Sequence, residues 1–76
     1  MTPLEALGQA LDAAVLSGHD ESLCQAYSDI AEHHATDGNL DSACFFWTQA
    51  LVFALSAGDT GREAELRVRL AAHGRV

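Results

Sequence analysis

The stretch from Ala43 to Leu55 contains no charged residue, and it holds the only Trp and all three Phe of the chain. If this stretch is helical, an apolar stripe at three-to-four-residue spacing runs along it: Ala43, Trp47, Ala50, Leu51 and Ala54. Phe45, Val52 and Phe53 fall outside that stripe. A helix that is apolar nearly all round has to be covered on more than one side. We therefore expect the rest of the chain, or another chain, to pack around it.

Evenly spaced glycines divide the rest of the sequence into helices. Gly18, Gly38 and Gly58 stand where the helical pattern breaks, and Gly74 follows the last helical segment. The expected helices span about 3–17, 21–36, 40–57 and 60–73. Because the connections are short, neighbouring helices should run antiparallel. The sequence therefore predicts an all-α fold with a single domain over residues 1–76.

Capping residues support these boundaries. Thr2, followed by Pro3 and Glu5, is typical of a helix start. In the second helix Asp20 is expected to cap, and in the third either Asn39 or Asp41. In the fourth, Thr60 and Glu63 form a capping-box pattern, with Asp59 as the competing cap. The expected apolar face of the first helix is made of Leu4, Leu7, Leu11, Ala14 and Val15, and that of the second of Leu23, Tyr27, Ile30, Ala31 and His34.

Charge is distributed unevenly along the chain, whose formal net charge is −7. Residues 1–61 contain no Lys or Arg, and all four basic residues are arginines in the last fifteen positions: Arg62, Arg67, Arg69 and Arg75. This balance argues against nucleic acid or an anionic membrane as a partner. The arginines either complement the dipole of the last helix or meet an acidic surface on a partner or a second copy.

The sequence also carries an expectation about location. The N-terminus lacks the basic start and long apolar run of a signal peptide, and the run 43–55 is too short to span a bilayer. We therefore expect a cytoplasmic protein whose two cysteines are reduced.

An internal repeat links the two halves of the chain. Residues 9–34 align with residues 49–74 without a gap, at an offset of forty. The identical pairs are Gln9/Gln49, Ala10/Ala50, Leu11/Leu51, Ala14/Ala54, Gly18/Gly58, Ala31/Ala71 and His33/His73. The repeating unit is a helical hairpin of about forty residues, which is typical of a solenoid.

The residues of this hairpin resemble a tetratricopeptide repeat (TPR). The matching positions are Tyr27, Ile30, Ala31 and His34 on the first helix, and Ala43, Trp47 and Ala50 on the second. Three positions depart from the pattern: His34 stands where Tyr is usual, Ile30 replaces Leu, and Leu55 replaces a closing Pro. The resemblance implies stacked helical hairpins in a TPR-like, right-handed solenoid fragment. It also implies a non-catalytic scaffold or adaptor that binds a protein or peptide.

In the resembled family, the first helix of each hairpin lines a concave groove that holds an extended peptide. The matching positions are Gln25, Ser28, Asp29, Glu32 and Ala35, and then Glu65, Val68, Arg69 and Ala72. The helix at 21–36 lacks basic clamp residues, which argues against an acidic C-terminal peptide as the ligand. The alternative is a groove filled only by solvent.

A second candidate surface lies on the outer side of the helix at 40–57. Phe45 and Val52 share a face there, with Thr48 and Gln49 between them, and exposed apolar residues of this kind often mark an interface. We expect a homodimer or higher oligomer, with Phe45, Gln49, Val52 and Phe53 at the interface. The alternative is that Phe45 packs against the first helix of the same chain. A further reading is a helical regulator or secretion-chaperone-like subunit that binds one permanent partner through this patch.

The remaining motifs give little support for a metal site, a disulfide or catalysis. The possible metal ligands form no recognised spacing: His19, His33, His34, His73, Cys24 and Cys44. Cys24 and Cys44 are expected at opposite ends of a hairpin, roughly 15 Å apart by helical rise, and therefore as packing residues. The sequence contains no phosphate-binding loop and no nucleophile elbow. We therefore expect no enzyme activity and no cofactor, and a small metal or thiol sensor is the remaining alternative.

Overall fold

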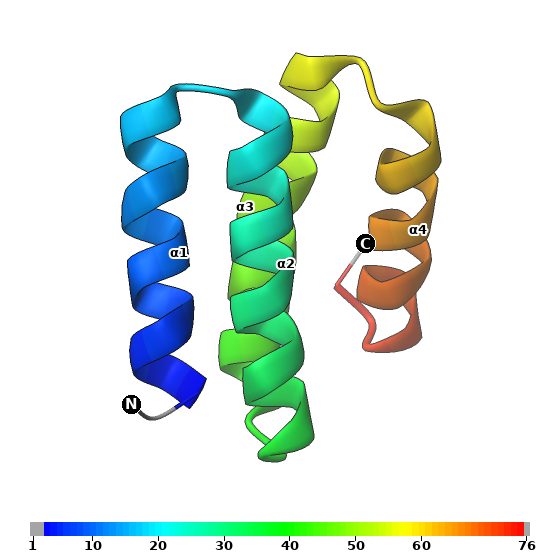
Figure 1. Ribbon diagram of the computed structural model, residues 1–76. Helices are drawn as coiled ribbons and strands as arrows, with labels where there is room; N and C mark the ends of the chain where they lie inside the picture. Colours follow the sequence, from blue (N-terminus) through cyan, green and yellow to red (C-terminus); the bar gives the residue numbers. More distant parts are fainter. Residues whose placement is uncertain (1–2, 76) are drawn as a thin grey trace.

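The computed structural model describes residues 3–75, and these form four α-helices joined by short turns (Figure 1). They are α1 (Pro3–Ser17), α2 (Asp20–Thr36), α3 (Leu40–Ala57) and α4 (Thr60–Ala72). No strand occurs within this described range. The all-α class is confirmed, and the predicted boundaries differ from the observed ones by one residue at the start of α2 and one at the end of α4.

The turns follow the expected glycine positions. Gly18, Gly38 and Gly58 have φ angles of 69°, 79° and 71°, a left-handed conformation that glycine adopts without a Cβ penalty. Asn39 caps α3 by accepting a hydrogen bond from the Ser42 amide at 3.4 Å. This decides between the two caps that the sequence allowed for α3.

Capping differs from prediction at α2. Asp20 is the first residue of the helix, and the N-cap is His19, whose side chain makes no capping hydrogen bond. Asp20 and Glu21 therefore both lie in the first turn, where their charge still complements the helix dipole. In α4 the cap is Asp59, which accepts from the Arg62 amide at 3.0 Å. The predicted cap of α1, Thr2, lies outside the described residues.

The helices form a thin array. Close backbone contacts join each helix only to its neighbours in the sequence: α1 to α2, α2 to α3, and α3 to α4. Figure 1 shows consecutive helices running antiparallel. In this view α3 lies behind α2, whereas α1, α2 and α4 lie on the near side. The array measures 32 × 30 × 14 Å. Its faces are therefore broad relative to its thickness.

The core lies where α2, α3 and α4 meet. Trp47 is only 3% exposed, as its place in the apolar run predicted, and Leu66 and Leu70 of α4 are buried beside it. Ala31 and Ala43 are fully buried at the contact between α2 and α3. The core cluster of buried residues contains none from α1.

Aromatic rings extend this core toward the outer side of α3. The Tyr27 ring stacks on Phe53 with centroids 5.5 Å apart, and the His34 ring stacks on Phe46 at 5.4 Å. His34 thus packs as an aromatic ring at the position where the repeat pattern has Tyr. The free thiols of Cys24 and Cys44 are buried in the same core, where they act as small apolar side chains.

The apolar face of α1 is only partly covered. Ala14 is its single buried residue, whereas Leu4 and Val15 of the expected face are exposed. The reason is that α2 is the only helix that packs against α1, so one side of the face has no neighbour. α1 is therefore the least anchored of the four helices.

An ion pair also joins the start of α3 to the segment after α4. Arg75, just after α4, donates a hydrogen bond to the Asp41 carboxylate in the first turn of α3. This hydrogen bond, together with the attraction between the two charges, raises the pKa of Arg75. The contact holds the end of α4 against the start of α3.

Within the described residues, α3 is also the one helix that is long and apolar enough to cross a membrane. It has eighteen residues and a mean hydropathy of 1.3. Length and composition alone give this result, and the central helix of a soluble fold gives the same one. Here α3 supplies five buried residues to the core.

Candidate functional site

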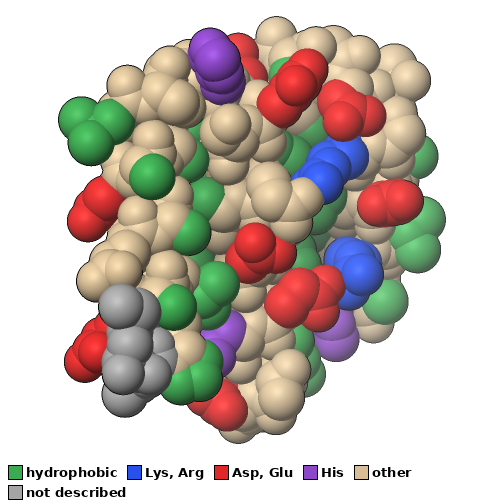
Figure 2. All heavy atoms as spheres, viewed as in Figure 1, with side chains coloured by type: hydrophobic (Ala, Val, Ile, Leu, Met, Phe, Trp, Pro, Cys, Tyr) green, Lys and Arg blue, Asp and Glu red, His purple; other side chains and the backbone are tan. Residues whose placement is uncertain are grey.

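A groove runs between α2 and α4, with α3 beneath it. It encloses about 490 Å³, within the range of ligand-binding clefts. Figure 2 shows Arg side chains in the strip between α2 and α4, with acidic side chains beside them. The lining residues are Gln25, Ser28, Asp29, Glu32, Trp47, Asp59, Gly61, Arg62, Glu65, Leu66 and Arg69.

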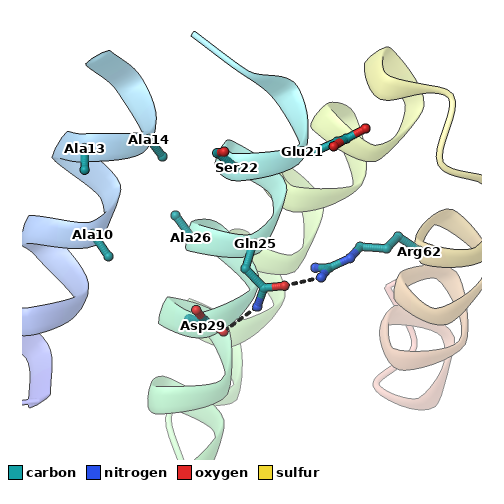
Figure 3. A pocket seen from close by; sticks show the side chains of 9 residues that line it. All are labelled: Ala10, Ala13, Ala14, Glu21, Ser22, Gln25, Ala26, Asp29 and Arg62. Carbon is teal, nitrogen blue, oxygen red and sulfur yellow. Dashed lines mark hydrogen bonds between the residues drawn. The ribbon is translucent and has the colours of Figure 1, made fainter. Parts of the chain in front are cut away.

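Two side-chain contacts cross the groove. Arg62 reaches from α4 and donates a hydrogen bond to the Gln25 side chain, which itself donates to Asp29 at 2.8 Å (Figure 3). Arg69 pairs with Glu32, with 2.6 Å between Nη1 and Oε1. Both side chains of the Arg69–Glu32 pair are about half exposed, and such surface pairs contribute roughly 0–1 kcal/mol. The groove can therefore open by rotating these side chains at small cost.

The floor of the groove is the Trp47 indole. The Arg69 guanidinium carbon lies 5.6 Å from its ring centroid, within the range of a cation–π contact. The His73 ring is nearly parallel to the indole, with centroids 5.8 Å apart. The indole thus contacts one side chain of α4 and one from the segment that follows α4.

Two polar atoms at this groove lack partners. The Trp47 indole N–H and the Ser28 hydroxyl are both buried, and neither has a hydrogen-bond partner within the described residues. A buried polar group left unpaired costs about 1–3 kcal/mol, so native structures rarely keep one without a reason. Both of these residues line the groove.

The groove is acidic overall. Four carboxylates line it, from Asp29, Glu32, Asp59 and Glu65, against the two arginines Arg62 and Arg69. Asp59 is occupied in capping α4, and Glu32 in pairing with Arg69. In the described range, Glu65 has neither a hydrogen bond nor an ion pair. Its carboxylate is therefore available to a ligand.

Six of the nine positions matched to the groove of the resembled family line this groove: Gln25, Ser28, Asp29, Glu32, Glu65 and Arg69. Val68 is 70% exposed and lies in an adjoining hollow with Ala64. Of the flanking alanines, Ala35 packs against the core, and Ala72 is exposed outside the groove.

Sequence reasoning missed Arg62, Asp59 and the role of Trp47 as the floor. One signal was present: Arg62 precedes Arg69 by seven residues, so both point to the same side of α4. Asp59 had been considered only as a helix cap, and Trp47 only as a core residue.

The residues expected at an oligomer interface divide into two groups. Phe45 and Val52 are 58% and 50% exposed on the outer side of α3, and Leu55 is exposed beside them. Phe53 turns inward to stack on Tyr27, and Gln49 is half-buried. The ring contact of Phe45 is with Phe46 of its own helix, at 5.2 Å, rather than with α1.

A second hollow separates α1 from α2. It encloses about 550 Å³, and its α1 wall consists of Ala10, Ala13 and Ala14 (Figure 3). Ser22 and Ala26 face these alanines from α2. The α1 wall therefore presents methyl groups, and the polar lining comes from Glu21, Ser22, Gln25 and Asp29 of α2 and from Arg62 of α4.

The Cys and His residues form no cluster around a common point. Over residues 3–75, no group of three or more His, Cys, Asp or Glu side chains could hold a metal ion. His33 pairs with Asp37 at 3.4 Å within the last turn of α2 and its cap.

Comparisons with protein-family models, with curated proteins and with solved structures found no match to this chain. Function is therefore inferred from the geometry of the groove and of the outer face of α3.

Proposed function

We propose that the chain is a non-catalytic protein–protein interaction module that holds a segment of a protein or peptide partner in the groove between α2 and α4. The observation that carries this proposal is the unpartnered, buried Trp47 N–H at the floor of a groove with polar walls from two helices. A segment laid along the groove supplies a carbonyl acceptor there. The weak contacts across the groove give way to it.

The TPR-like arrangement of stacked, right-handed hairpins is part of the same proposal. Support comes from Ala31 and Ala43, which are fully buried where the TPR pattern has small residues, and from Trp47, which fills the adjacent space. The forty-residue repeat supports it as well, since Gly18 and Gly58 end corresponding helices with φ angles of 69° and 71°. The net charge of −7 favours a protein partner over nucleic acid or membrane, and a cytoplasmic location is part of the proposal.

Affinity capture from cells of the source tests the groove. The wild-type chain is compared with Glu32→Arg, which reverses the charge of the groove wall, and with Asp12→Arg, which makes the same change on the exposed side of α1. We expect a protein identified by mass spectrometry to be lost with Glu32→Arg and retained with Asp12→Arg. Equal recovery with both variants would count against the groove.

A second candidate function is favoured by the exposed Phe45 and Val52. Here the outer face of α3 either joins copies of the chain or binds one permanent partner, as in a regulator or secretion-chaperone-like subunit. Apolar patches on a protein surface commonly mark such interfaces. We propose self-association through this face.

Analytical ultracentrifugation tests self-association. At tens of micromolar, the wild-type chain should sediment as a dimer or larger, and Phe45→Glu should shift it to monomer. Glu5→Gln, which leaves the outer face of α3 intact, is the control. A wild-type chain that sediments as a clean monomer at these concentrations would end this candidate.

A further inference from the structure

We infer that the segment bound in the groove between α2 and α4 is an extended peptide bearing Lys or Arg side chains. Its main chain gives acceptors to Trp47 and Ser28, and its cations meet the carboxylates of the walls. This inference rests on the proposed function of the groove and names the chemical class of its ligand.

The Trp47 indole N–H and the Ser28 hydroxyl can each donate a hydrogen bond to an acceptor on a bound ligand. The Trp47 indole N–H is a donor only, and this buried atom has no hydrogen-bond partner in the described residues. The Ser28 hydroxyl on the α2 wall lacks a partner as well. An extended peptide presents carbonyl groups at regular intervals and hydrogen-bonds both atoms without regard to its sequence.

The negative charge of the groove walls favours cationic side chains on the bound peptide. Asp29 and Glu65 face a ligand from opposite walls, and Glu65 has no partner in the described part of the chain. The first sixty-one residues carry no cation, so the field outside the groove is negative as well. Such a field attracts cationic segments and repels acidic ones.

Arg69 shows how a ligand cation is accommodated. Its guanidinium lies over the Trp47 ring and pairs with Glu32 at 2.6 Å. The groove thus already accepts a guanidinium between an aromatic face and a carboxylate. A peptide cation takes a similar position beside Glu65, or replaces the half-exposed Arg69.

An acidic ligand finds no equivalent position. Arg62 is engaged with Gln25, and Arg69 with Glu32, so both guanidinium groups of the groove already have a partner. The carboxylates of the walls would then be left facing a like charge. The charges of the groove therefore discriminate against acidic segments.

Trp47 is the only Trp in the chain, so its fluorescence directly reports whether the groove is occupied. The full chain is titrated with three Trp-free nonapeptide pools that are rich in Lys and Arg, rich in Asp and Glu, or neutral. We expect a saturable change in Trp47 emission with the basic pool, at an affinity at least ten times that of the neutral pool. The acidic pool should give no change.

Variants locate the binding. With a dye-labelled basic peptide, Glu65→Gln should weaken binding about fivefold, and so should Ser28→Ala, since a charged or hydrogen-bonded contact contributes about 1 kcal/mol. Asp12→Asn removes the same charge from α1 and should leave the affinity unchanged. Circular dichroism of each variant shows whether its helices are intact.

The outcomes separate the inference from the proposed function. Preferential binding of the acidic or the neutral pool, weakened by Ser28→Ala, would overturn the basic-peptide inference and leave the groove as a binding site. Equal weakening by Glu65→Gln and Asp12→Asn would overturn the inference, because attraction would then be diffuse. No change in Trp47 emission with any pool would overturn both.

Discussion

Ala31 of α2 and Ala43 of α3 have no exposed surface, and both belong to the buried cluster that also contains Trp47. Atoms added to either side chain must therefore displace neighbours, because protein interiors are close-packed.

Ala31→Leu should therefore destabilise the fold. Forcing extra methylenes into a filled contact costs about 1–3 kcal/mol, which lowers the midpoint of urea unfolding followed by circular dichroism. The matched control is Ala71→Leu at the corresponding position of the repeat, where the alanine is exposed. That change should stay within about 0.5 kcal/mol of wild type. Similar midpoints for the two variants would contradict this account.

Caps show how far single residues could be predicted. The glycines at the helix ends were correct, because a left-handed residue leaves few alternatives to glycine. Asp20 was wrong as a cap, since an acid is favourable at several positions of a first turn and its type does not fix the register. Asn39 and Asp41 could not be separated for the same reason.

At the scale of helices, α1 differs from the other three. Its periodicity predicted an apolar face, yet Leu4 and Val15 remain exposed. Periodicity shows which residues share a side of a helix, whereas coverage depends on how many helices reach that side. Only α2 reaches α1, and the buried Ala26 and Ile30 of α2 lie outside the core cluster that α2 shares with α3 and α4.

Two glycine substitutions test the local requirements of the helices. Gly8→Ala, inside α1, should stabilise the chain by about 0.5–1 kcal/mol, because an added Cβ meets nothing within 4 Å and alanine favours helix. Gly58→Ala should destabilise it by about 1–2 kcal/mol, since the φ of 71° is strained for any residue with a Cβ. Thermal unfolding should therefore shift in opposite directions. A shift of the same sign in both variants would contradict the left-handed turn.

At the scale of the whole molecule, the groove was predicted better on α2 than on α4. Four of the five α2 positions named for binding line it, whereas on α4 only two of the four do, and Arg62 was missed. The side of α4 that faces α2 depends on the rotation of α4 about its axis. That rotation is set by Leu66 and Leu70 packing on Trp47, a contact between distant parts of the chain.

The dependence of the core on α4 rather than on α1 gives the last prediction. Leu66 and Leu70 are buried against the indole, and burial of each leucine contributes about 1.5–3 kcal/mol, whereas α1 contributes only Ala14. A chain lacking residues 1–18 should therefore keep its helical circular dichroism and the blue-shifted emission of buried Trp47. A chain lacking residues 60–76, which removes a similar length, should shift its emission to the red and unfold without a cooperative transition. Loss of cooperative unfolding in the chain without α1, with retention in the chain without α4, would reverse the roles assigned to the two terminal helices.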